Sequence, residues 1–157
     1  MQFYVKTESR SEKKLYFETH FRDMRSKKAD FSGKSKKVIM IVDDDSSIRS
    51  SLSSLLEKEY EVVGMDNGPD ALRYFKETRS PDLVVLDMEI PKLNGRVFVR
   101  RIKFDPIHNK VPVVLISSVN SRLIITSFLK LGVMDYIVKP FQPEDLVQKI
   151  VDIIDPR

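Results

Sequence analysis

The chain has 157 residues, a formal net charge of +4 and no cysteine, and 41% of its residues are hydrophobic. This length suffices for one domain with a hydrophobic core, and the lack of cysteine excludes disulfides, thiolate metal sites and cysteine nucleophiles. No apolar run approaches the roughly 20 residues of a membrane-spanning helix, and the first residues lack the apolar core of a secretory signal. We therefore expect a cytoplasmic protein.

The charge is divided unevenly along the chain. Residues 1–37 contain 11 Lys and Arg against 5 Asp and Glu, whereas residues 38–157 contain 16 against 18. We therefore expect a basic N-terminal extension (1–37), with a short strand, an amphipathic helix at about 11–26 and a linker, followed by a folded domain (38–157). Basic segments can bind nucleic acid or anionic membranes, but most are only solvated, and nucleic acid is not an expected partner of this chain.

From Val38 onward, short apolar runs alternate with segments of helical spacing. The apolar runs predict strands at 38–42, 61–65, 83–86, 113–116 and 136–138. A helical pattern follows each run, including a fourth helix at about 121–131 and a last helix from about 143. Because each helix carries the chain back across the sheet, the strands must be parallel. The sequence thus predicts a doubly wound α/β fold.

Polar side chains end the first, third, fourth and fifth predicted strands. In a doubly wound sheet these ends meet at one edge, where the active crevice lies. Carboxylates gathered there repel one another, and Mg²⁺, which prefers oxygen ligands, is the simplest cation to neutralise them. A lysine opposite the metal would complete a site suited to a phosphoryl group in transfer. The residues concerned are Asp43, Asp44, Asp45, Asp87, Ser117, Ser118 and Lys139.

These positions carry motifs that resemble those of bacterial two-component receiver domains of the chemotaxis-regulator type. The motifs are Val42-Asp43-Asp44, the segment 85–91 with Asn94-Gly95, Ser117-Ser118, and Lys139-Pro140-Phe141. The resemblance covers about residues 36–155. It implies a five-stranded parallel sheet of order 2-1-3-4-5, flanked by five helices.

The resemblance also implies a metal-dependent phosphoacceptor. Asp87 would accept the phosphoryl group, as carboxylate nucleophiles do in aspartyl-phosphate formation, from a sensor histidine kinase or a phosphotransfer protein. Mg²⁺ would bind Asp43, Asp44, Asp87 and the backbone carbonyl of Glu89. Such a domain catalyses only its own phosphorylation and dephosphorylation, and it is not a metabolic enzyme.

A conformational switch is implied as well. Lys139 would pair with Asp87 and then with the phosphoryl group, and a cis peptide bond would precede Pro140. Ser117 would form a hydrogen bond to a phosphoryl oxygen, and Tyr136 would turn inward as Ser117 moves. An unknown output protein would read the change.

Three residues depart from the commonest pattern. Asp45 adds a third carboxylate and could cap the following helix. Glu89 places a large acid beside the site, where it could influence phosphate lifetime. Ser117 stands where threonine is commoner, and the missing methyl group could loosen its coupling to Tyr136.

The predicted fourth helix is more apolar than one buried stripe requires. Its excess either enlarges the core or forms a partner surface with the fifth strand and fifth helix. We favour the partner surface, for an output protein or a homodimer, with Leu123 and Ile125 exposed. His108 is also expected at the surface. The apolar residues of the helix are Leu123, Ile124, Ile125, Phe128, Leu129 and Leu131.

Two other functions are open at this point. A haloacid-dehalogenase-type phosphatase also uses a doubly wound sheet, magnesium and an aspartyl-phosphate, with Asp43 and Asp45 as its acidic pair. That alternative leaves Asp87 without a role and lacks the later acidic pair of such enzymes. The other alternative is an interaction module on a receiver scaffold that works without phosphorylation.

Overall fold

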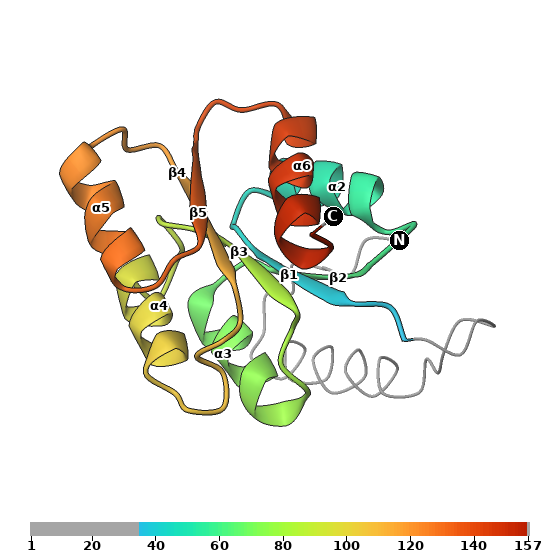
Figure 1. Ribbon diagram of the computed structural model, residues 1–157, viewed down its shortest axis with the longest axis horizontal. Coiled ribbons are helices and arrows are strands. Elements are labelled where there is room, and N and C mark those ends of the chain that lie inside the picture. The colour runs from blue at the N-terminus through green and yellow to red at the C-terminus, as the bar shows by residue number, and fades with distance from the viewer. Residues whose placement is uncertain (1–34, 157) are drawn as a thin grey trace.

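The computed structural model describes residues 35–156, and this part of the chain forms a single parallel sheet with five helices (Figure 1). The extension's expected strand and helix lie outside the described residues. The strands, in the spatial order β2-β1-β3-β4-β5, are β1 (Val38–Val42), β2 (Glu61–Met65), β3 (Leu83–Asp87), β4 (Val113–Ser117) and β5 (Asp135–Val138). The helices are α2 (Ser46–Leu56), α3 (Gly68–Glu77), α4 (Gly95–Lys103), α5 (Arg122–Lys130) and α6 (Pro143–Ile154). The predicted architecture and strand order are confirmed.

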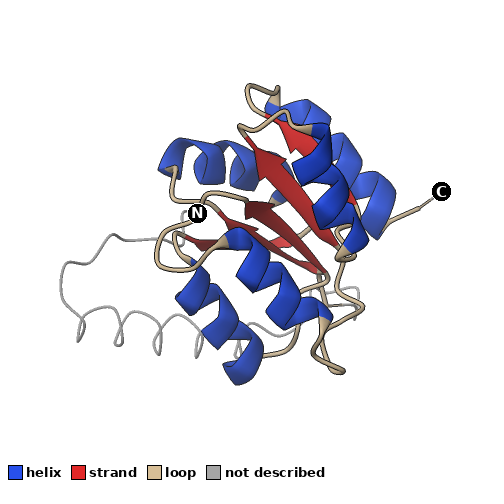
Figure 2. Ribbon diagram, turned by 90° about the vertical axis from the view of Figure 1, so that its left-hand side faces the viewer, coloured by secondary structure: helices blue, strands red, loops and turns tan. Residues whose placement is uncertain are grey.

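Two layers of helices cover the sheet (Figure 2). Side chains alternate along β1, so that Val38, Met40 and Val42 join the core beneath α3, α4 and α5, while Ile39 and Ile41 join the core beneath α2 and α6. Because both faces are covered, β1, β3 and β4 are buried throughout. This double burial explains why the strands are continuous apolar runs in the sequence.

Local signals fix where the helices begin and end. Asp45 caps α2 by accepting hydrogen bonds from the amides of Ser47 and Ile48, as the sequence suggested. Gly132, with φ of 101°, follows the end of α5, where a left-handed residue commonly terminates a helix. β1 begins at Val38, where the sequence placed the start of the folded domain, although the division into extension and domain stays a prediction.

Two expectations about exposure are wrong. Ile125 is buried, with 6% of its surface exposed, because it faces the sheet together with Phe128; Leu123, at 84%, is exposed as expected. The side chain of His108 is only 12% exposed, because it packs edge-on against Phe75 and bonds to Ser80. Among residues 35–156, no helix has the length and apolar character needed to cross a membrane.

Candidate functional site

Three charged side chains meet at the edge where the strands end. β1 and β3 are neighbours, so Asp43, just after β1, lies beside Asp87, the last residue of β3. Lys139 follows β5 and reaches across β4, placing its Nζ 2.9 Å from Asp87 Oδ2 and 3.6 Å from Asp43 Oδ2. The Lys139–Pro140 peptide bond is cis, as expected. The structure therefore brings together the acids and the lysine that the sequence selected.

Asp43 is the most constrained of these acids. Its side chain is fully buried, and its Oδ1 accepts a hydrogen bond from the Asp45 amide at 2.8 Å. Its Oδ2 is buried without a hydrogen-bond donor. Burial, reinforced by the charge of Asp87, raises the pKa of Asp43 from 3.8 to about 6. The Lys139 ammonium lies 3.6 Å from this oxygen, and a bound cation would supply the direct contact that it lacks.

The same carboxylates favour the charged form of Lys139. Burial by itself lowers the pKa of an amine, but the hydrogen bond to Asp87 and the charge of Asp43 outweigh it and raise the pKa of Lys139. The lysine therefore stays charged. It neutralises only part of the site, because two carboxylates face one ammonium group.

The acidic cluster fits a hard divalent cation. One carboxylate oxygen from each of Asp43, Asp44 and Asp87 lies within 4.8 Å of the others, and carboxylate oxygens are the ligands that Mg²⁺ uses. Asp87 Oδ1 accepts a hydrogen bond from the Glu89 amide at 2.9 Å, which fixes the loop after β3. The side chain of Glu89 accepts a bond from Ser118 Oγ at 3.2 Å. That the Glu89 carbonyl is a metal ligand stays a prediction.

The two expected switch residues lie on the neighbouring strands. Ser117 ends β4 and is buried; its Oγ accepts from the Val119 amide at 2.9 Å and donates to the Val119 carbonyl at 3.1 Å. Tyr136, on β5, is half-buried and packs against the core beneath α3 to α5. In this structure the Ser117 hydroxyl is therefore engaged by its own loop rather than by the acidic cluster.

One supporting residue was missed in the sequence. Arg49, on α2, is only 6% exposed, and its guanidinium donates to the backbone carbonyl of Asp43. This bond ties the first turn of the following helix to the end of β1. The available signal was an arginine between Ile48 and Leu52, on the apolar side of the helix.

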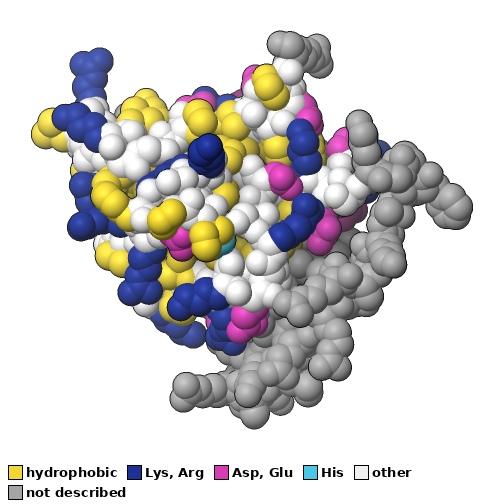
Figure 3. Space-filling view, turned by 60° about the horizontal axis from the view of Figure 1, so that its bottom comes forward, with side chains coloured by type: hydrophobic (Ala, Val, Ile, Leu, Met, Phe, Trp, Pro, Cys, Tyr) yellow, Lys and Arg dark blue, Asp and Glu magenta, His cyan; other side chains and the backbone are white. Residues whose placement is uncertain are grey.

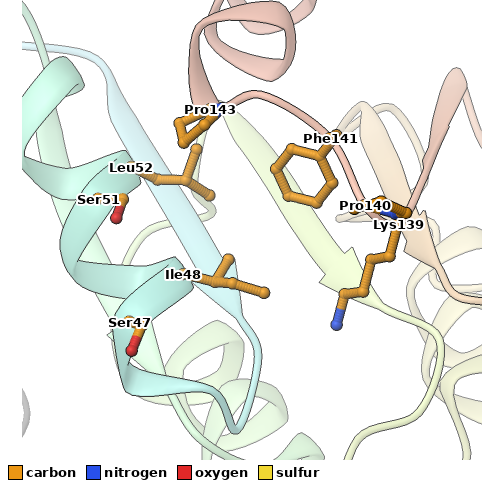
Figure 4. A pocket seen from close by; sticks show the side chains of 8 residues that line it. All are labelled: Ser47, Ile48, Ser51, Leu52, Lys139, Pro140, Phe141 and Pro143. Atoms are coloured by element: carbon orange, nitrogen blue, oxygen red, sulfur yellow. The ribbon is translucent and has the colours of Figure 1, made fainter.

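An apolar groove of about 340 Å³ adjoins the site, between α2 and the loop from β5 to α6. In Figure 4 the apolar side chains from the helix and from the loop face one another across it, and the Lys139 amine points out of the groove. The groove is thus an apolar surface directly beside the lysine of the site. Its lining includes Ile48, Leu52, Lys139, Pro140, Phe141 and Pro143.

Comparisons with known proteins agree with this geometry. Residues 39–151 match the family described as the response regulator receiver domain. The chemotaxis protein CheY of Thermotoga maritima is 34% identical over 117 residues, covering 73% of this chain and 94% of that protein. The solved structure of the BeF3-activated DrrB receiver domain superposes with a TM-score of 0.69 and 27% identity, covering 77% of this chain and 99% of that one.

A longer relative is the probable transcriptional regulator ycf27 of Guillardia theta, which is 35% identical over 122 residues, covering 77% of this chain and 46% of that protein. The chain spans about half the length of the first such relatives that it matches. The family match nevertheless covers most of the chain. The chain therefore belongs to the receiver-domain family of two-component response regulators, whose known mechanism is phosphorylation of an aspartate.

Proposed function

We propose that Asp87 is the aspartate of this receiver domain that accepts the phosphoryl group. It ends the central strand β3, is 4% exposed, and has both carboxylate oxygens fixed, one by the Glu89 amide and one by Lys139. In the reaction, a carboxylate oxygen forms a bond to phosphorus while the bond from phosphorus to the donor's leaving group breaks. The leaving group departs with the electron pair, and Lys139 then pairs with the transferred phosphoryl group.

The observation that carries this proposal is the buried Oδ2 of Asp43, which has no hydrogen-bond donor although it adjoins Asp87. We assign it, with Asp44, Asp87 and the Glu89 carbonyl, as the Mg²⁺ site. When bound, the metal would supply positive charge to the phosphoryl oxygens. Asp43 would then be ionised despite its burial, because the cation offsets the repulsion from Asp87.

The switch follows from the present bonds of Ser117. To reach a phosphoryl oxygen on Asp87, its hydroxyl must leave the Val119 backbone. This would move the loop from β4 to α5 and open space toward which Tyr136 turns. The output would then be read on α5, β5 and α6. Exposed apolar side chains gather at the α5 end of this surface, on α5 itself and just before β5: Leu123, Ile124, Leu129 and Met134. An output protein or a second copy of the chain would bind there.

The phosphodonor would be a histidine kinase or a phosphotransfer protein. The groove between α2 and the β5–α6 loop is apolar and lies beside Lys139. A donor helix seated there would bring its phosphohistidine to the acidic edge. The groove is therefore the surface that we assign to the donor protein.

The deciding experiment is intact mass spectrometry of the full chain after incubation with Mg²⁺ and acetyl phosphate. We expect one phosphoryl adduct in the wild type and none in Asp87→Asn, and loss of the adduct when Mg²⁺ is chelated. An adduct that persists in Asp87→Asn would move the nucleophile to another carboxylate. No adduct with either acetyl phosphate or a phosphorylated donor protein would favour an interaction module that works without phosphorylation.

A further inference from the structure

Basic and acidic residues are unevenly distributed over the described part of the chain. Residues 92–130, which include α4, α5 and the loops beside them, contain eight Lys and Arg and a single acid, Asp105. The remaining residues of 35–156 contain nine Lys and Arg against seventeen Asp and Glu. One side of the domain is therefore strongly basic, while the rest, with the phosphoacceptor site, is acidic.

Within the basic side, two large apolar side chains project from the loop between α4 and β4. Phe104 is 73% exposed and Ile107 is 80% exposed. The guanidinium carbon of Arg100 lies 5.9 Å from the centroid of the Phe104 ring, and Arg101 and Lys110 are exposed nearby in the sequence. Figure 3 shows this side of the molecule, where hydrophobic side chains lie among Lys and Arg.

The loop that carries the two side chains is held by several bonds. The His108 ring bonds to Ser80 Oγ at 2.6 Å, and the Asp105 carbonyl accepts from the His108 amide at 3.1 Å. Lys103 Nζ donates to the carbonyls of Asn109 and Val111 at 3.2 and 2.7 Å. Phe104 and Ile107 are thus presented by a braced loop, and their exposure is a fixed feature of the fold.

The position of this loop distinguishes it from the phosphoacceptor site. It precedes β4, so it lies at the edge where the parallel strands begin, opposite the acidic edge where they end. The first described residues lie at the same edge, because Arg79 donates to the Lys36 carbonyl at 3.0 Å and its neighbour Ser80 bonds to His108. Residues 1–34, which attach at this edge, contain nine Lys and Arg against five Asp and Glu.

We propose that this edge binds peripherally to an anionic lipid surface. Phe104 and Ile107 would insert at the level of the headgroups, and Arg100, Arg101 and Lys110 would contact anionic headgroups. The two apolar side chains are 73% and 80% exposed on a loop and are not among the residues that line the groove beside α2, which suits insertion into lipid better than binding a helix in a groove. The acidic site then faces away from the negative surface, so phosphorylation and membrane binding occur at opposite edges.

The test is cosedimentation of the full chain with vesicles of phosphatidylcholine alone or with added phosphatidylglycerol. We expect binding only to the anionic vesicles, weakening as salt rises. Replacing both side chains, Phe104→Ser with Ile107→Ser, removes their burial in lipid and should lower the affinity roughly tenfold. The matched control is Leu123→Ser: Leu123 is 84% exposed but lies in the first turn of α5, at the acidic edge, and its loss should leave binding unchanged.

Three outcomes would overturn the proposal. The wild type could fail to bind anionic vesicles, or the double variant could bind as tightly as the wild type, which would assign binding to the basic extension alone. Binding to duplex DNA but not to vesicles would assign the basic side to nucleic acid. Labelling of Asp87 by acetyl phosphate should be equal in the wild type and the double variant, so failure here is distinct from failure of the proposed function.

Discussion

The two edges of the sheet are built from the same five strands but hold charge in different ways. Where the strands end, Asp43 and Asp87 are almost fully buried and share one lysine. Where the strands begin, Lys37 and Asp155 pair with nearly half of each side chain exposed. At the carboxyl edge, the ends of β1, β3 and β5 place two acids and a lysine in one crevice, whereas the pair at the opposite edge remains open to solvent.

The largest loss of stability is expected from a substitution that disturbs the backbone of the acidic edge, and a small loss there would contradict the comparison between the two edges. Gly95 begins α4, and a Cβ added there would lie 2.6 Å from the Met88 carbonyl oxygen. Gly95→Ala must therefore displace the loop that follows Asp87, at a cost of about 3 kcal/mol in the free energy of unfolding. Urea denaturation would measure it, and calorimetry should show weaker Mg²⁺ binding.

A matched control exists on β2. A Cβ at Gly64 would meet only side-chain atoms of Arg49, its Cδ at 3.4 Å and its Nε at 3.8 Å, and no backbone atom. Gly64→Ala should therefore change stability by much less than Gly95→Ala. Equal losses in the two variants would mean that the close approach of α4 to Met88 does not constrain the acidic edge.

The second effect concerns the buried charge. At neutral pH and without metal, Asp43 is ionised in a place that favours its neutral form, since its pKa is raised from 3.8 to about 6. Asp43→Asn removes this charge and should stabilise the metal-free protein by about 2 kcal/mol. The same substitution removes a proposed metal ligand, so Mg²⁺ binding in calorimetry should be lost. A variant that is less stable than the wild type without metal would contradict this account of Asp43.

The sign of the pH dependence follows from the same shift. The folded protein keeps the Asp43 proton up to about pH 6, whereas the unfolded chain releases it near pH 3.8. The protonated carboxyl therefore contributes stability at low pH, and this contribution is lost as pH rises from about 4 to 6. Without metal, the free energy of unfolding of Asp43→Asn should exceed that of the wild type by an amount that grows as pH rises from about 4 to 6. With saturating Mg²⁺, the wild type should become the more stable of the two.

Most of the acidic edge was predictable, because the sequence pattern shows where the strands end. The three central strands, β1, β3 and β4, are buried throughout, and a charged or hydroxyl residue ends each apolar run. The topology then places Asp43, Asp87 and Lys139 together without further information. The cap formed by Asp45 followed from the same reasoning, since an aspartate before a helix has a known use.

The rest depended on packing that no local pattern records. Ile125 and Leu123 are two residues apart on a helix that is apolar on most sides, and only the fold shows that Ile125 faces the sheet. His108 is held by Phe75 and Ser80, which are distant in sequence. The exposure of Phe104 and Ile107 could not be predicted either, because the sequence of a loop does not show whether another part of the fold covers its apolar residues.

The smallest effect tests the opposite edge. Tyr60 Oη donates to Asp155 at 2.6 Å, and burial together with this bond raises the pKa of Tyr60 to about 12. Asp155 remains paired with Lys37 and is partly exposed, so Tyr60→Phe leaves no buried group without a partner and should cost about 1 kcal/mol. Urea denaturation of Tyr60→Phe, Asp155→Ala and the double variant would isolate the bond. If Tyr60→Phe lowered the free energy of unfolding as much as Gly95→Ala does, this edge would be as constrained as the acidic one. A coupling energy of about 1 kcal/mol between Tyr60 and Asp155 would instead show that the hydrogen bond contributes as an ordinary single bond does.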